Sequence, residues 1–146
     1  MPVLVIAVTA GLTVVAIEVL PRTLLFPVVD LFAPTGVQST FLQPGQTTPA
    51  DCERMLSETA RDLRATCSAC KVVERCVHGL PAMLRRAVSH EPISQPSARA
   101  VNEPLTVVFS AADPSLALSA CQRAGAMSAP PPAPSHRVCF AAGMPR

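Results

Sequence analysis

Four of the six cysteines lie within residues 48–78, which read TPADCERMLSETARDLRATCSACKVVERCVH. Thr48 is a favourable N-cap, Pro49 suits the first helical position, and Asp51 completes a capping-box pattern three residues after Thr48. We therefore expect a helix to begin here and to run to about residue 67. Its buried stripe would hold the side chains spaced three or four apart, namely Cys52, Met55, Leu56, Ala60, Leu63 and Cys67.

The remainder of this stretch predicts a second helix from about Cys70 to Val77, with Gly79 as its C-cap. Pro81 can begin a third, short helix that would end at about residue 89. Three prolines disfavour a helix between residues 91 and 104. The first half of the folded part is therefore predicted to be mainly helical.

The second half of the chain predicts a strand, a helix and a strand. Residues 105–110, LTVVFS, are rich in β-branched side chains, which favour a strand. Asp113 and Pro114 form an N-cap and first-position pair that would start a helix, and Gly125 would end it. Residues 137–143, RVCFAAG, could add a short strand. We expect a small α+β element in which the two strands could be adjacent.

An apolar segment opens the chain, since residues 2–17 carry no charged side chain. As a helix, residues 3–20 would span about 27 Å, close to the thickness of a bilayer core. Glu18 would then reach the headgroups, Pro21 would end the helix, and Arg22 would flank it. The segment predicts a transmembrane anchor. A cleaved signal peptide and a buried element of a soluble core are the alternatives, because runs of Val, Ile and Thr also form strands.

These elements predict a mainly α fold with a small α+β element, in which an N-terminal transmembrane helix precedes a small disulfide-stabilised helical domain. Residues 33–49 are uncharged and rich in proline and glycine, and they read as an extended stalk. The expected organisation is an anchor with a flanking apolar segment over residues 1–29, a linker over 30–49, a helical and α+β extracytoplasmic domain over 50–125, and a Pro-rich tail that could hold a short strand over 126–146.

The cysteines are the strongest functional signal in the sequence. An even number of cysteines in a short chain is typical of disulfides formed outside the cytoplasm. Six cysteines allow many connectivities, and the sequence does not choose among them, but two pairs have a physical motive. An antiparallel helix pair would bring Cys52 to Cys76. The strand–helix–strand unit would bring Cys121 to Cys139.

Cys67 and Cys70 form a Cys-x-x-Cys motif, and three interpretations of it are open. As a disulfide, the pair requires a break in the helix, because a regular helix places i, i+3 side chains poorly for the bond. A thiol–disulfide oxidoreductase would use the pair in catalysis, although in thioredoxin-like proteins the motif opens a helix and here it follows one. A metal-binding module would add Cys76 and His78 as ligands, at a spacing that matches no common zinc knuckle.

Composition narrows the classes of function. The net charge is only +2, and aromatic residues make up 3% of the chain. A nucleic-acid-binding protein would show a basic stripe and stacking aromatic residues, so we exclude that class. The sequence contains no nucleophile-elbow, phosphate-loop or zinc-protease motif, and we predict no catalytic residue and no cofactor.

We therefore expect a non-catalytic interaction or accessory protein of the cell envelope. It would be anchored once in the cytoplasmic membrane, with its C-terminal domain on the extracytoplasmic, periplasmic side. Its partners would be the membrane and another envelope protein or polymer, and not a nucleic acid. A fragment or accessory subunit of an envelope-biosynthesis enzyme is a further alternative.

Overall fold

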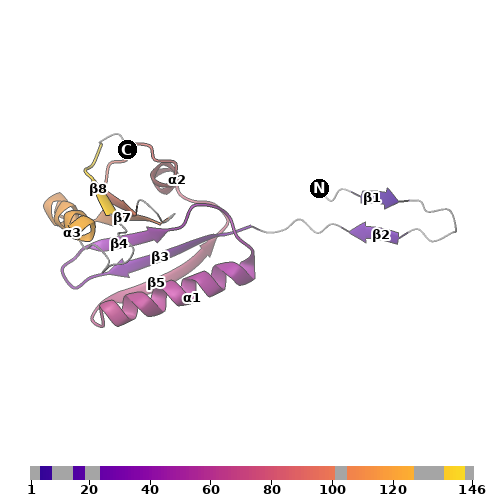
Figure 1. Cartoon of the computed structure of the whole chain (residues 1–146), viewed down its shortest axis with the longest axis horizontal. Helices are drawn as coiled ribbons and strands as arrows, with labels where there is room; N and C mark the ends of the chain where they lie inside the picture. Colours follow the sequence, from indigo (N-terminus) through magenta and orange to yellow (C-terminus); the bar gives the residue numbers. More distant parts are fainter. Residues whose placement is uncertain (1–3, 8–14, 19–23, 101–104, 127–136, 144–146) are drawn as a thin grey trace, which may run out of the picture.

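The structure, a computed structural model, describes residues 4–7, 15–18, 24–100, 105–126 and 137–143. Within these residues, six antiparallel strands form one sheet in the order β5-β3-β4-β7-β6-β8, and three helices pack against it (Figure 1). A separate two-stranded antiparallel sheet consists of β1 (Leu4–Ala7) and β2 (Val15–Glu18). The elements of the main body are β3 (Phe26–Phe32), β4 (Gln38–Leu42), α1 (Pro49–Thr66), β5 (Lys71–Val77), α2 (Ala82–Val88), β6 (Ser97–Ala100), β7 (Thr106–Ser110), α3 (Pro114–Ala126) and β8 (Arg137–Phe140).

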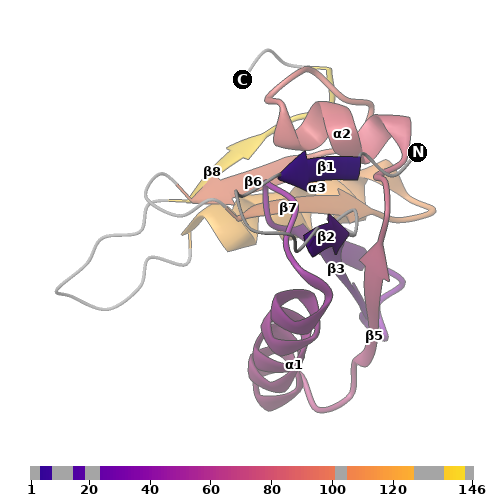
Figure 2. The same ribbon diagram turned by 90° about the vertical axis from the view of Figure 1, so that its right-hand side faces the viewer.

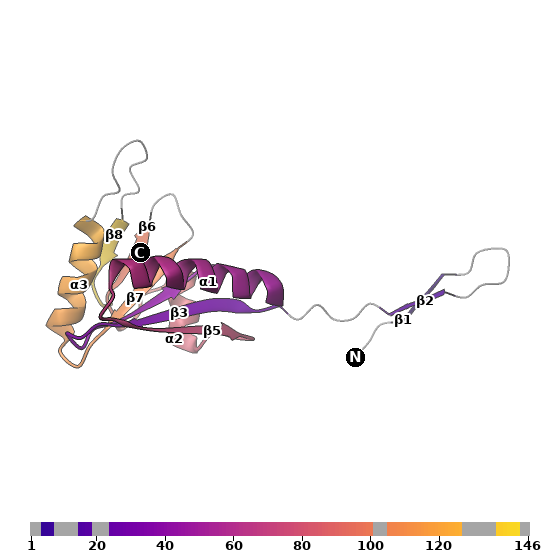
Figure 3. The same ribbon diagram turned by 90° about the horizontal axis from the view of Figure 1, so that it is seen from below.

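The helices cover both faces of the main sheet. Val28, Leu42 and Val108 point to one face and form a buried cluster with α2. On the opposite face, Val29 packs under α1 and Val107 packs under α3. Because side chains alternate along a strand, successive residues of β3 and of β7 pack into the buried clusters on opposite faces of the sheet. Figure 2 shows α1 and α2 on opposite sides of the strands, and Figure 3 shows α1 in front of them with α3 beside β8.

The helix predicted from the capping pattern is confirmed as α1. The Thr48 hydroxyl accepts a hydrogen bond from the Asp51 amide at 3.2 Å and donates one to the Asp51 carboxylate at 2.8 Å. Cys52, Leu56 and Ala60 are the buried residues of the helix, as the spacing predicts. Both the start of this helix and its buried stripe therefore follow from local sequence.

The expectation of a mainly helical fold is wrong, because a sheet forms the centre of the molecule. Residues 71–77, predicted as a helix, form β5, which pairs with β3 along its whole length. The apolar positions of this segment fit both a helix and a strand, and pairing with β3 decides between the two. Residues 33–49, interpreted as a stalk, contain β4, which follows β3 through a turn where Gly36 has a φ of 83°.

The prediction of an N-terminal transmembrane helix is also wrong. Leu4–Ala7 and Val15–Glu18 pair as antiparallel strands, from Leu4 opposite Glu18 to Ala7 opposite Val15. The segment is rich in β-branched side chains, which lose rotamer freedom in a helix and favour strands. Among the residues that the structure describes, no helix is both long and apolar enough to cross a membrane.

The second half of the chain holds the predicted elements in a different arrangement. The helix and strands predicted there correspond to α3, β7 and β8, and the short helix before them corresponds to α2. The Asp113 carboxylate accepts a hydrogen bond from the Ser115 amide at 2.8 Å, as an N-cap does. β7 and β8 are not adjacent, because β6, which the sequence did not predict, pairs with both. Residues 127–136 and 144–146 of the predicted tail lie outside the described residues.

Candidate functional site

Two long-range disulfides tie helices to the edges of the sheet. Cys52–Cys76 joins α1 to β5, and Cys121–Cys139 joins α3 to β8. β5 and β8 are the two outermost strands, so each edge of the sheet is held by one crosslink. Both predicted pairings are confirmed. The motive for the first is wrong, because Cys76 lies on a strand that packs against α1 and not on a second helix.

The third disulfide, Cys67–Cys70, closes the turn between α1 and β5. The helix ends as this pairing requires, because Cys67 is the C-cap of α1 and its N–H donates to the Leu63 carbonyl. The C-terminal end of a helix carries partial negative charge and disfavours a thiolate, whereas redox-active motifs gain from the positive N-terminal end. The local field at this pair therefore does not favour redox catalysis.

The cysteines of the metal-binding alternative are all engaged in disulfides. Cys76 is bonded to Cys52, and Cys67 is bonded to Cys70, so none of the three cysteines offers a thiolate while the bonds are intact. His78 follows the end of β5 and is exposed. Within the described part of the chain, no group of three or more His, Cys, Asp or Glu side chains could hold a metal ion.

A buried carboxylate forms the centre of a polar cluster that the sequence analysis missed. The Asp30 side chain on β3 is only 4% exposed. Its Oδ1 accepts hydrogen bonds from the Thr40 hydroxyl at 2.7 Å and from the Gln38 amide at 3.2 Å, and its Oδ2 is paired with the half-exposed Arg75 guanidinium. These partners lie on β4 and β5, which flank β3. The charge of Asp30 is thereby compensated, and the positions of the Gln38 and Arg75 side chains are fixed.

Beside this cluster, four strands present one row of side chains on the face where α2 lies. Phe32 is the register partner of both Lys71 and Gln38, and Gln38 is the partner of Ser110. Phe32 lies four residues after Val28, so it points to the same face as the cluster beneath α2. Phe32 is 39% exposed, Lys71 is exposed, and Gln38 and Ser110 are half-buried. We call these four residues, Lys71, Phe32, Gln38 and Ser110, the exposed row.

A hollow of about 190 Å³ lies at the Ser110 end of the exposed row. Its walls are the end of β7, the loop before β6 and the first turn of α3. A typical pocket for a drug-sized ligand holds about 300 Å³ or more, so the hollow alone suits only a small group. Its lining residues are Ser94, Gln95, Pro96, Phe109, Ser110, Ala111, Pro114 and Ala117.

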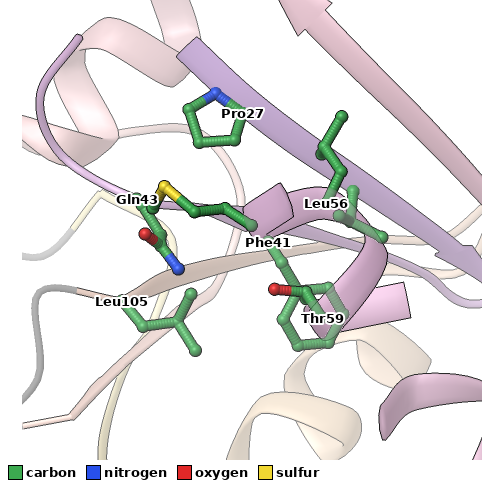
Figure 4. Close-up of a pocket in the computed structure, with 8 residues that line it drawn as sticks. Pro27, Phe41, Gln43, Leu56, Thr59 and Leu105 are labelled. Atoms are coloured by element: carbon green, nitrogen blue, oxygen red, sulfur yellow. The ribbon is translucent and has the colours of Figure 1, made fainter. Parts of the chain in front are cut away.

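A second cavity lies in the seam between α1 and the sheet (Figure 4). Its volume is only about 10 Å³, which is close to the space that a single water molecule needs. We therefore regard it as a packing gap within the core and not as a ligand site. It is lined by Pro27, Val29, Phe41, Gln43, Met55, Leu56, Thr59 and Leu105.

Lys71 gives the exposed row its charge. It has no ion-pair partner among the described residues. On the same strand, Glu74 points to the opposite face of the sheet, where it is paired with Arg64 of α1. Arg75 points to the face of the row, but buried Asp30 compensates its charge. The β5 end of the row therefore carries a net positive charge.

No protein-family model, curated protein or solved structure matches this chain, so its function has to be argued from its own residues. Two features bear on that function. The first is the pairing of every cysteine, and the second is the exposed row beside the Asp30 cluster.

Proposed function

We propose that this chain is a disulfide-stabilised, non-catalytic domain that works outside the cytoplasm, where it binds a component of the cell envelope. The observation that carries the proposal is the pairing of all six cysteines in three disulfides. Disulfides form and persist in oxidising compartments, whereas thiols in the cytoplasm of most organisms are kept reduced. A chain whose helices are crosslinked to its sheet is suited to the first environment.

The placement of the crosslinks supports the same conclusion. A sheet edge that is not paired can open or recruit another strand. Here Cys76 holds β5 and Cys139 holds β8, which are the two edges. The disulfides thus stabilise the parts of the fold that have a neighbouring strand on one side only.

The exposed row supports a binding role. Its residues lie on paired strands, and the Asp30 cluster fixes Gln38 from below. A ligand would therefore contact side chains whose backbone is already ordered, which lowers the entropic cost of binding. Uncharged hydrogen-bonding groups, one aromatic ring and one ammonium group are together suited to recognition of a polar ligand.

The proposal is tested with protein secreted through an export leader and purified without a reductant. We expect no cysteine to react with an alkylating agent before reduction, and we expect saturable co-sedimentation with at least one insoluble envelope preparation. The matched control is the same protein after full reduction and alkylation, which should lose both its fold and its binding. Free thiols in the folded, exported protein, or equal sedimentation of the reduced control, would contradict the proposal.

A further inference from the structure

The exposed row has the dimensions of a short stretch of polymer. Neighbouring strands lie about 4.8 Å apart, so the row spans about 14 Å from β5 to β7. The hollow lined by Ser110 continues it at the β7 end. The strip is one side chain wide, and its area of order 100 Å² is far below the roughly 800 Å² per partner of a stable protein–protein interface. A thin, extended ligand fits this strip better than a folded protein does.

The side chains of the row are chemically complementary to the surface of a carbohydrate. The Phe32 ring is exposed to solvent and offers an apolar face to the C–H groups of a sugar ring. Beside it on β4, the amide oxygen of Gln38 can accept a hydrogen bond from a sugar hydroxyl, while the amide nitrogen of Gln38 donates to Asp30 and Thr40. One strand further, on β7, the Ser110 hydroxyl can both donate and accept. On the other side of the Phe32 ring, the ammonium group of Lys71 can pair with an anionic substituent.

We propose that the exposed row binds an acidic polysaccharide, with a sugar ring stacked on Phe32 and a carboxylate of the chain paired with Lys71. This inference rests on the proposed function, because it names the class of envelope component that the domain recognises. The argument for an acidic chain is charge complementarity, since Lys71 has no ion-pair partner among the described residues. The hollow at Ser110 would receive a sugar at the far end of the bound segment.

The test uses the full-length oxidised protein and three probes in parallel. These are a fluorescently labelled hexauronate from alginate, maltohexaose as a neutral oligosaccharide of the same length, and vesicles of phosphatidylglycerol. We expect the hexauronate to bind about tenfold more tightly than maltohexaose at low salt, which corresponds to one ion pair of moderate strength. Added salt should weaken hexauronate binding and leave maltohexaose binding unchanged.

Two substitutions in the row test the contributions of its charged group and its aromatic ring to binding independently. Lys71→Gln should weaken hexauronate binding about tenfold and leave maltohexaose binding unchanged, because only the charged interaction is lost. Phe32→Ala should weaken the binding of both oligosaccharides about tenfold, because it removes the stacking surface. The matched controls are Arg61→Gln on α1 and Leu116→Ala on α3, which remove an exposed cation and an exposed apolar side chain elsewhere. Neither control should change binding.

Several outcomes would overturn the inference. It fails if maltohexaose binds as tightly as the hexauronate, if the row variants bind like the controls, or if the vesicles bind and the hexauronate does not. Because Phe32 and Lys71 are exposed, their variants should keep the unfolding midpoint of the parent protein, which is measured alongside. If the hexauronate does not bind but the protein still co-sediments with an envelope preparation, the ligand class is wrong and the proposed function stands.

Discussion

Removal of the Cys52–Cys76 disulfide should destabilise the protein about twice as much as removal of the Cys67–Cys70 disulfide. This bond joins the first turn of α1 to the edge strand β5, and Cys52 is fully buried in a cluster with Val29 and Leu56. The perturbation is the double variant Cys52→Ala/Cys76→Ala. It leaves no free thiol, so the remaining cysteines cannot exchange with an unpaired partner.

The size of the effect follows from the length of chain that each disulfide closes. The two cysteines of this pair are separated by 24 positions, those of Cys121–Cys139 by 18, and those of Cys67–Cys70 by 3. The chain-entropy relation gives stabilisations of about 3.5, about 3.2 and about 1.6 kcal/mol, respectively. Loss of packing adds to the first two values, because Cys52 and Cys121 are both fully buried and alanine leaves part of their volume empty.

Urea unfolding followed by far-ultraviolet circular dichroism measures these differences. Fluorescence is unsuitable, since the chain contains neither Trp nor Tyr. The comparison uses unfolding free energies and not midpoints, because loss of a crosslink expands the unfolded state and raises the denaturant slope. Cys67→Ala/Cys70→Ala is the matched control, and it should lose about half as much free energy as the Cys52–Cys76 variant. An equal or larger loss in the control would refute the reasoning from loop length.

Three smaller perturbations test other parts of the structure. Asp30→Ala should lower the free energy of unfolding in urea by about 2 to 3 kcal/mol, because it leaves the buried Thr40 hydroxyl without its acceptor. A loss below about 0.5 kcal/mol would show that the cluster is not buried as described. Ser97→Ala should leave the stability of the protein unchanged or raise it by about 1 kcal/mol, because the buried Ser97 hydroxyl has no hydrogen-bond partner among the described residues. A clear loss of stability would reveal a partner. The hydrogen bond from the Thr48 hydroxyl lowers the pKa of Asp51 from its ordinary value of 3.8, so this carboxylate stabilises the fold above that pH and loses its effect as the pH falls through its lowered pKa. The stability difference between the parent and Asp51→Asn should therefore be constant from pH 5 to 7 and shrink below pH 3.8, and a difference that grows with acid would contradict this sign.

Local signals in the sequence were sufficient to predict the three helices that pack on the main sheet. Thr48 and Asp51 mark the start of α1, and Asp113 with Pro114 marks the start of α3, because capping involves residues that are close in sequence. The same reasoning failed for β5. Its residues Lys71–Val77 carry no period that separates helix from strand, and the outcome depends on pairing with β3, which lies more than 35 positions earlier in the chain.

The disulfides and the exposed row also differ in whether they depend on residues that are close in sequence or on the pairing of distant strands. The pairing of Cys121 with Cys139 could be predicted because the two residues lie on elements that follow each other along the chain. The exposed row could not be predicted, because it depends on the register between strands and a shift of one residue would move Phe32 to the other face. A lone aspartate inside the apolar run of β3 was the available signal for the polar cluster, and it has meaning only once its neighbours on β4 and β5 are known.

Peptide mapping of the native, exported protein tests the central claim most directly. The protein is alkylated without reduction, digested at low pH to prevent exchange, and analysed by mass spectrometry. The structure predicts no alkylated cysteine and three crosslinked species, which join Cys52 to Cys76, Cys67 to Cys70, and Cys121 to Cys139. Alkylated cysteines in protein with a cooperative unfolding transition would contradict the assignment to an oxidising compartment. A different set of three pairs in such protein would contradict the fold.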